Sequence, residues 1–232
     1  MKRYLPLLII VGVALITAGA ATMFYRAKMG AQVAAARPAS STASGTTAAV
    51  TPAMTPQTDA ALAHARGPAN APVTLEMYGD FQCPPCAAAS AAIDELMKDG
   101  DKVRLVFHEF PLAMHAHALE AAMAAEAAGQ QGHFWEMHDM LYKYQDVWSK
   151  ASNAARFFAG YAEALGLNPE QFQTDANSAQ TKSLVMAEGD TGVQRGVRNT
   201  PTIIINGEEV KGIFTPESLR LGIDAALAKQ GR

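Results

Sequence analysis

Two prolines separate the chain's only two cysteines, in the run Cys83-Pro-Pro-Cys86 of a 232-residue sequence. A stretch with strand-like alternation, Val73-Thr-Leu-Glu-Met-Tyr78, lies before this run and ends at a Gly-Asp break. The run also opens a helical stretch, about 84–98, with proline in the first turn, where a helix tolerates it. A strand must therefore end beside a helix N-terminus that carries both cysteines, which favours an α/β fold.

The spacing of the two sulfurs indicates dithiol chemistry. Residues three apart at a helix start lie within one turn, so Cys83 and Cys86 can close a disulfide. The positive end of the helix dipole favours a thiolate on Cys83, the N-cap residue. Cys83 is therefore the expected nucleophile and Cys86 the expected resolving cysteine. Pro84 and Pro85 have no amide hydrogen, so the first helical donor for the Cys83 sulfur is the Cys86 N–H.

Three other uses of the cysteine pair compete with a redox role. A structural disulfide that closes so short a loop removes little entropy from the unfolded chain. A structural zinc site normally has four ligands, and the chain has no second C-x-x-C. His115 and His117 could add ligands, but their rings point apart at a helix start. Two buried cysteines without a function are the third alternative. We interpret the pair as redox-active and predict no metal site.

The first 28 residues indicate a membrane anchor. Basic residues flank an uncharged, apolar run from Tyr4 to Tyr25. A helix of this length crosses a hydrocarbon layer of about 30 Å. A cleaved signal peptide is the alternative, since Ala18-Gly-Ala20 resembles a cleavage site, but signal-peptide apolar cores usually end by about 15 residues. We expect a periplasmic or other extracytoplasmic protein, anchored to the inner membrane, or soluble in the periplasm if the segment is cleaved.

Residues 29–70 predict a flexible linker, because Ala, Pro, Ser and Thr dominate and no apolar period persists. The expected folded domain is 71–232, a usual size for one domain. Its net charge is −8, whereas residues 1–70 carry +5. Contacts to phosphate need clustered positive charge, so nucleic acid is excluded as an expected partner.

The rest of the domain alternates strand-like and helical stretches. A second strand is predicted at 103–110, a helical block at about 113–195, and a hairpin at 202–211 around Asn206-Gly207. Thr215-Pro216 opens a last helix, with a capping residue followed by proline at the first helical position. This order predicts a three-layer α/β fold with helices inserted in the middle.

Four segments of the domain form a recognisable set. They are the strand and dithiol run 73–86, Val103-Arg-Leu-Val-Phe-His-Glu-Phe-Pro-Leu112, Gly132-His-Phe-Trp-Glu-Met-His138 and Gly196-Val-Arg-Asn-Thr-Pro-Thr-Ile-Ile-Ile-Asn-Gly207. Together they resemble the DsbA-type thioredoxin-fold proteins, most closely the branch that includes BdbD. The resemblance implies a thioredoxin-like fold with an inserted helical domain.

The resemblance also assigns site residues. It implies that Thr200 and Pro201 form a cis-proline loop beside the dithiol, where the backbone pairs with an incoming peptide. A native cis X–Pro bond usually lies at a tight, functionally placed turn. Residues with possible supporting roles are Asp80 and Phe81, which precede Cys83 and position it, together with Pro84, Pro85 and Glu76.

Two positions depart from the family pattern. Relatives usually carry a buried, proton-transferring glutamate six residues before the first cysteine, where this chain has Met77. Neighbouring strand residues face opposite sides, so we interpret Glu76 as a solvated strand acid, unless a bulge shifts the register. The best-known oxidase of the family has histidine in place of Pro85. We therefore expect a less stabilised Cys83 thiolate and a milder oxidant.

These observations predict an extracytoplasmic thiol–disulfide oxidoreductase that exchanges disulfides with cysteines of exported proteins. The oxidase direction is the main expectation, with a reductase or isomerase as the alternative, because the sequence does not set the direction. A non-redox metal-binding or chaperone module on the same fold is an alternative from another class. No cofactor beyond the Cys83–Cys86 disulfide is expected. The family implies a membrane redox partner, and the oligomeric state is left open.

Overall fold

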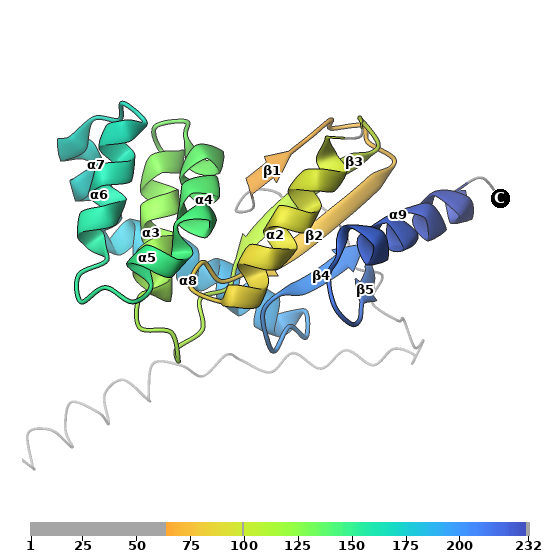
Figure 1. Ribbon diagram of the computed structural model, residues 1–232. Helices are drawn as coiled ribbons and strands as arrows, with labels where there is room; N and C mark the ends of the chain where they lie inside the picture. The colour runs from red at the N-terminus through yellow and green to blue at the C-terminus, as the bar shows by residue number, and fades with distance from the viewer. Residues whose placement is uncertain (1–63, 99, 231–232) are drawn as a thin grey trace, which may run out of the picture. The chain divides into compact units, whose positions relative to one another are not determined.

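The computed structural model describes residues 64–98 and 100–230. Within this part, five strands form one mixed sheet in the order β1-β3-β2-β4-β5 (Figure 1). The central strands β2 and β3 are parallel, and the other neighbouring pairs are antiparallel. The strands are β1 (His64–Arg66), β2 (Val73–Gly79), β3 (Val103–Glu109), β4 (Thr202–Ile205) and β5 (Glu208–Val210).

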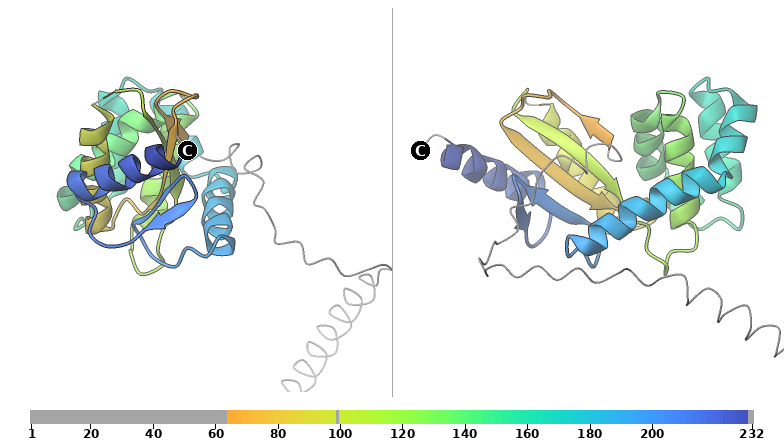
Figure 2. Two further views of the ribbon diagram at one scale, coloured as in Figure 1. Left: turned by 90° about the vertical axis from the view of Figure 1, so that its right-hand side faces the viewer. Right: turned by 180° about the vertical axis from the view of Figure 1, so that it is seen from behind.

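Helices cover both faces of the sheet. α2 (Pro84–Met97) and α9 (Pro216–Gln230) pack against each other on one face, and α8 (Ala179–Gln194) lies on the other (Figure 2). The parallel pair β2 and β3 needs a crossover connection, which α2 supplies. Both strands are buried at every one of their last three positions, as expected where helices cover both faces. The prediction of a three-layer α/β fold is confirmed.

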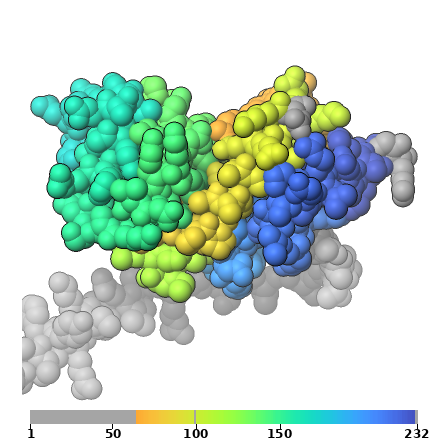
Figure 3. Space-filling model, viewed as in Figure 1, coloured from red at the N-terminus to blue at the C-terminus, as the bar shows by residue number. Residues whose placement is uncertain are grey.

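Helices fill the chain between β3 and β4. At the centre of this block, α3 contacts α4, α6, α7 and α8, and its many buried alanines leave room for those neighbours. The end of α5 is held by Trp148, a fully buried residue whose Nε1 donates to the Leu141 carbonyl at 2.7 Å. The surface of the block meets that of α2 (Figure 3). Besides α8, the block consists of α3 (Ala118–Gly129), α4 (Phe134–Lys143), α5 (Gln145–Trp148), α6 (Ala155–Ala164) and α7 (Pro169–Ala176).

The predicted membrane anchor, residues 1–28, lies outside the described residues, as does most of the predicted linker. Across 64–98 and 100–230, each helix is either too short or too polar to cross a bilayer.

The predicted end of the linker, residue 70, is wrong. β1 already pairs antiparallel with the edge of β3, with Ala65 opposite Val106. The His64 ring stacks on Phe134 at 3.3 Å between centroids, and Arg66 forms ion pairs that include Asp94. A three-residue strand has no usable alternation, and its partners lie far along the chain, so the sequence pattern could not identify it.

The predicted hairpin is confirmed. Asn206 and Gly207 connect β4 to β5 with φ values of 46° and 84°, the left-handed conformation that a tight two-residue hairpin turn requires. The predicted cap of the last helix is also confirmed, because Thr215 Oγ1 accepts a hydrogen bond from the Ser218 N–H at 3.2 Å.

A methyl group at Gly192 is expected to destabilise the fold. A Cβ at this position of α8 would lie 2.9 Å from ring carbons of both Phe110 and Tyr78. Both rings are buried, so moving them aside would cost packing energy. We expect Gly192→Ala to lower the free energy of unfolding by about 1–3 kcal/mol in urea titrations. Gly189→Ala in the same helix meets nothing within 4 Å, so it should raise the free energy of unfolding by up to about 1 kcal/mol. Equal effects of the two changes would contradict this account.

Candidate active site

The dithiol lies at the junction between the end of β2 and the start of α2. Cys83 is the N-cap of α2, with extended backbone (φ −80°, ψ 116°), and Pro84 and Pro85 form the exposed start of the helix. The Cys83 N–H donates to the Asp80 carbonyl at 3.1 Å, which closes the turn between strand and helix. Both cysteines are free thiols in this structure. The Cys83 residue is 5% exposed and Cys86 is 0% exposed, so an incoming sulfur reaches Cys83 first.

The two thiols have opposite electrostatics. A hydrogen bond from the Cys86 thiol lowers the pKa of Cys83 to about 6, against the opposing effect of burial. The backbone N–H of Cys86, the donor expected from the sequence, lowers the pKa of Cys83 further. Burial raises the pKa of Cys86 far above its ordinary value, and the hydrogen bond with Cys83 adds to this. Cys83 is thus a thiolate at neutral pH and Cys86 a protonated thiol.

The loop before β4 lies against the outer cysteine. The Cys83 sulfur lies 3.5 Å from the Thr200 carbonyl oxygen, to which it donates when protonated, although the two residues are 117 positions apart. The Thr200–Pro201 peptide bond is cis, as the family resemblance implies. The structure therefore brings together both parts of the site that the sequence assigned, the dithiol and the Thr200–Pro201 loop.

Asp80 organises the loop that carries Cys83. Its buried carboxylate accepts hydrogen bonds from the Gln82 N–H at 2.7 Å and the Leu112 N–H at 2.9 Å. It also lies 2.7 Å from His115 Nδ1. These contacts join the β2–α2 loop to the loop after β3, so the role of Asp80 is to hold the loop that carries Cys83 in place.

The other side chains next to the dithiol are structural too. Phe81 is 1% exposed and packs on Phe107, with ring centroids 5.3 Å apart. The two histidines considered as metal ligands face different partners. His115 lies against Asp80, whereas His117 Nε2 lies 2.9 Å from the Ala151 carbonyl.

The interpretation of Glu76 as a solvated strand acid is wrong. Its carboxylate accepts a hydrogen bond from Arg195 Nη1 at 2.6 Å and lies 3.3 Å from His108 Nε2. Although burial opposes the shift, His108 and Arg195 together lower the pKa of Glu76 to about 2. Met77 faces the apolar core at 1% exposure. Arg195 directly follows α8 as its C-cap residue, and the alternation of a single strand cannot reveal a partner from there.

Three glutamates near the end of β3 form a buried cluster that the sequence did not signal. Carboxylate oxygens of Glu109, Glu126 and Glu188 all lie within 4.8 Å of one another, a set that can hold a cation. Both oxygens of Glu109 lack a hydrogen-bond partner among the described residues. Burial, with the charges of Glu126 and Glu188, raises the pKa of Glu109 well above its ordinary value. The prediction of no metal site did not consider this group, because its members come from three separate elements.

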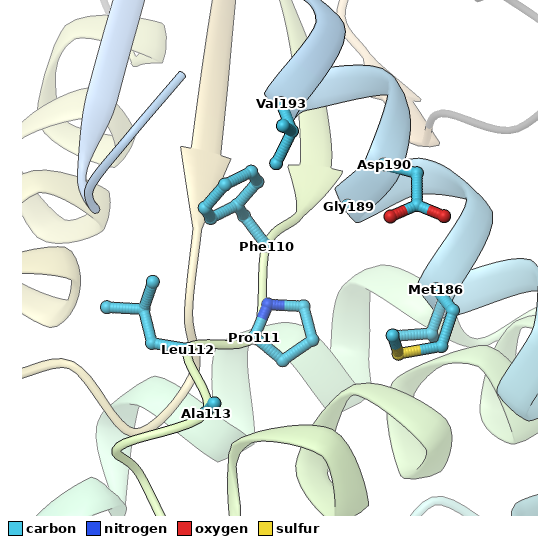
Figure 4. Close-up of a pocket in the computed structure, with 9 residues that line it drawn as sticks. Phe110, Pro111, Leu112, Ala113, Met186, Gly189, Asp190 and Val193 are labelled. Atoms are coloured by element: carbon cyan, nitrogen blue, oxygen red, sulfur yellow. The ribbon is translucent and has the colours of Figure 1, made fainter. Parts of the chain in front are cut away.

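An apolar pocket of about 230 Å³ opens between the loop 110–113 and α8 (Figure 4). Phe110 and Leu112 line it from the loop, and the half-exposed Met186 and Val193 line it from the helix. Leu112 connects this wall to the active-site loop, because its N–H binds Asp80.

Known proteins with similar sequence decide the family. Residues 59–225 match the family described as Thioredoxin. The chain belongs to the thioredoxin family. Among curated relatives, the domain is 39% identical over 166 residues to Na(+)/H(+) antiporter NhaA 1 of Salinispora arenicola, covering 71% of this chain and 25% of that protein. It is 38% identical over 168 residues to NhaA 1 of Mycolicibacterium gilvum, covering 70% and 26%. The chain thus spans about a quarter of the length of the curated relatives it matches.

Solved thioredoxin-like structures share the fold. A thioredoxin-like oxidoreductase from Silicibacter pomeroyi has a TM-score of 0.61 at 27% identity, covering 72% of this chain and 93% of its own. BdbD from Bacillus subtilis, in its oxidised form, has a TM-score of 0.65 at 22% identity, covering 72% and 94%. Wolbachia pipientis alpha-DsbA1 has a TM-score of 0.62 at 19% identity with the same coverage. The predicted thioredoxin-like α/β fold is therefore confirmed, with DsbA-like proteins among its structural neighbours.

Proposed function

We propose that this thioredoxin-family protein is an extracytoplasmic thiol–disulfide oxidase that passes the Cys83–Cys86 disulfide to cysteines of exported proteins. The observation that carries the proposal is the contrast between the two sulfurs. Cys83 has a lowered pKa at a helix N-terminus, while Cys86 is fully buried behind it. A stabilised thiolate favours the reduced protein, and this gives the disulfide its oxidising power.

The proposed reaction begins from the oxidised protein. A substrate thiolate attacks the Cys83 sulfur, the Cys83–Cys86 bond breaks, and Cys86 leaves as a thiolate that takes up a proton. Because burial raises the pKa of Cys86 so strongly, this protonation holds the mixed disulfide open. A second substrate thiolate then attacks the substrate sulfur of the mixed disulfide. The bond between that sulfur and Cys83 breaks, and Cys83 leaves as the more stable thiolate. The substrate loses two electrons to form its disulfide, and the protein gains them as a dithiol.

The Thr200–Pro201 loop is the proposed substrate contact. It lies against the Cys83 sulfur, so a peptide attacking that sulfur meets it directly. Thr200 presents backbone that an extended peptide can pair with, as strand addition to an exposed edge requires. We expect such pairing to depend little on substrate side chains, which suits a protein that acts on many exported chains.

The cellular setting is part of the same proposal. The apolar segment 4–25 would anchor the domain at the membrane, and the Ala- and Pro-rich stretch after it would act as the tether. Turnover needs an oxidant for the reduced dithiol, and a membrane redox protein is the proposed partner. The antiporter activity in the curated relatives' names is not proposed for this chain, since the match spans about a quarter of them.

A reductase or isomerase is the second candidate function. Pro85 stands where the best-known oxidase of the DsbA type has a histidine, and it offers neither a side-chain donor nor an amide hydrogen to the Cys83 thiolate. A less stabilised thiolate would make the disulfide harder to reduce. The BdbD-like branch belongs to the proposal as well, supported by the similar fold of BdbD.

Redox equilibration of the full chain tests the proposal. The fraction of Cys83–Cys86 disulfide is followed by thiol alkylation across glutathione ratios. We expect a reversible disulfide with a potential between about −120 and −200 mV, the range of oxidising dithiols. A potential near about −270 mV, as in reducing thioredoxins, would favour the reductase. If no ratio produces the disulfide, the redox function is refuted.

A further inference from the structure

A buried amide from the helical block holds the backbone of the active-site loop. Nε2 of Gln145, the first residue of α5, donates to the Phe81 carbonyl at 2.6 Å and to the Cys83 carbonyl at 3.0 Å. Gln145 is 6% exposed, and it is more than sixty positions from both partners in the sequence. One side chain thus holds the carbonyls on either side of Gln82.

The Cys83 carbonyl also takes part in starting α2. It accepts the Cys86 N–H at 3.0 Å and the Ala87 N–H at 3.4 Å. The same peptide unit therefore connects the helix to Gln145, and its orientation fixes the ψ angle of Cys83. That angle sets where the Cys83 sulfur lies relative to the amides of the helix N-terminus, which stabilise its thiolate.

The segment that carries Gln145 is itself held in place by other contacts. α5 ends at Trp148, which is 0% exposed and bonded to the Leu141 carbonyl. A further hydrogen bond joins the same two segments in the opposite direction, from Gln82 Nε2 in the loop to the Ser149 carbonyl at 3.1 Å. Three successive residues, 81–83, are thus bonded to the five-residue segment 145–149 of the helical block.

We propose that Gln145 is a positioning residue of the dithiol, which sets the direction of the Cys83 sulfur by holding the Phe81 and Cys83 carbonyls. This role rests on the proposed redox function. It predicts that loss of the amide donor alters the chemistry of Cys83 and not only the stability of the fold. The positive end of the amide dipole also lies beside Cys83, so its loss should make the thiolate less favourable.

Gln145→Met tests the role, because methionine keeps the length of the side chain and removes both donors. We expect the pKa of Cys83 in the reduced variant, measured from thiolate absorbance and from the pH dependence of alkylation, to rise by about one unit. The equilibrium constant with glutathione should shift about five- to tenfold between pH 7 and 8 toward the Cys83–Cys86 disulfide, making the variant less oxidising than wild type.

Gln131→Met is the matched control. Gln131 also makes two side-chain bonds to backbone within the helical block, donating to the Asn168 carbonyl at 3.3 Å and accepting the Asn168 N–H at 2.8 Å. Its loss should lower the free energy of unfolding without changing the Cys83 pKa or the glutathione equilibrium. If Gln145→Met fails to fold, Gln145→Asn replaces it, since the shorter side chain withdraws the amide from both carbonyls.

The outcomes separate the role of Gln145 from the proposed function. Unchanged Cys83 pKa and glutathione equilibrium in a folded Gln145 variant would overturn the positioning role, while wild type still formed its reversible disulfide. A wild-type protein that never formed the disulfide would refute the proposed function itself. A shift of equal size in Gln131→Met would also overturn the role, because the effect would then follow from any loss of bonding in the block.

Discussion

Replacing Cys83 with serine is expected to abolish disulfide transfer, lowering its rate at least about 1000-fold. Cys83 carries the sulfur that an incoming thiolate can reach, and the chain has only two cysteines, so without Cys83 there is no intramolecular disulfide to pass on. Cys86→Ser should behave differently. Its Cys83 thiolate can still attack a disulfide, but the resolving sulfur is missing. We expect this variant to accumulate mixed disulfides.

The measurement uses an unfolded test protein with two cysteines, reduced for the transfer assay with the oxidised wild type and with Cys83→Ser, and in its disulfide form for trapping by Cys86→Ser. Oxidation of the test protein is followed with wild type and both variants, and mixed disulfides are separated by non-reducing electrophoresis. Ser90→Ala, elsewhere in α2, serves as a control for a small change in the same helix. Mixed disulfide in Cys83→Ser would reverse the assigned roles of the two sulfurs, and its absence in Cys86→Ser would contradict the role of Cys83 as nucleophile.

The parts of the fold that the sequence predicts well are those with local causes. Proline in the first turn begins α2 at Pro84, and Asn206-Gly207 turns the hairpin, because both effects act over a few residues. The dithiol belongs to the same class, since its spacing and its place at a helix start lie within one short run.

The parts that were missed depend on partners far along the chain. Gln145 looks like any polar residue in a helical block, and only packing brings its amide to Phe81 and Cys83. Glu76 seemed solvated because alternation describes one strand, whereas Arg195 arrives from the end of α8. The strand β1 carries no pattern of its own. Each miss has the same physical origin, a tertiary contact that overrides a local preference.

The Thr200–Pro201 loop is an intermediate case. Its residues alone are compatible with an ordinary strand-opening proline. The resemblance of four separated segments to one family identified the loop, and its contact with the Cys83 sulfur across 117 positions is a tertiary feature.

The reduced protein is expected to gain stability as the pH rises from 5 to 8, by an amount that depends on Cys83. The thiol has an ordinary pKa of 9.0 and a folded-state pKa of about 6. Between these values the unfolded chain binds more protons than the folded one, so stability rises with pH and is lost again as the pH falls through 6. Integrating between pH 5 and 8 gives a contribution of about 2–3 kcal/mol.

Urea unfolding of reduced wild type and reduced Cys83→Ser at both pH values isolates this contribution. His108 and the buried glutamates titrate in both proteins, so their effects cancel in the difference. Cys86 contributes little to the difference up to pH 8, because burial raises its pKa in the folded state and its ordinary pKa in the unfolded chain is 9.0. The oxidised protein has no thiol at Cys83 and should follow the variant. Parallel pH profiles for reduced wild type and Cys83→Ser would mean that the fold does not stabilise the thiolate. The oxidising power proposed for the disulfide would then lose its physical basis, because it derives from that same stabilisation.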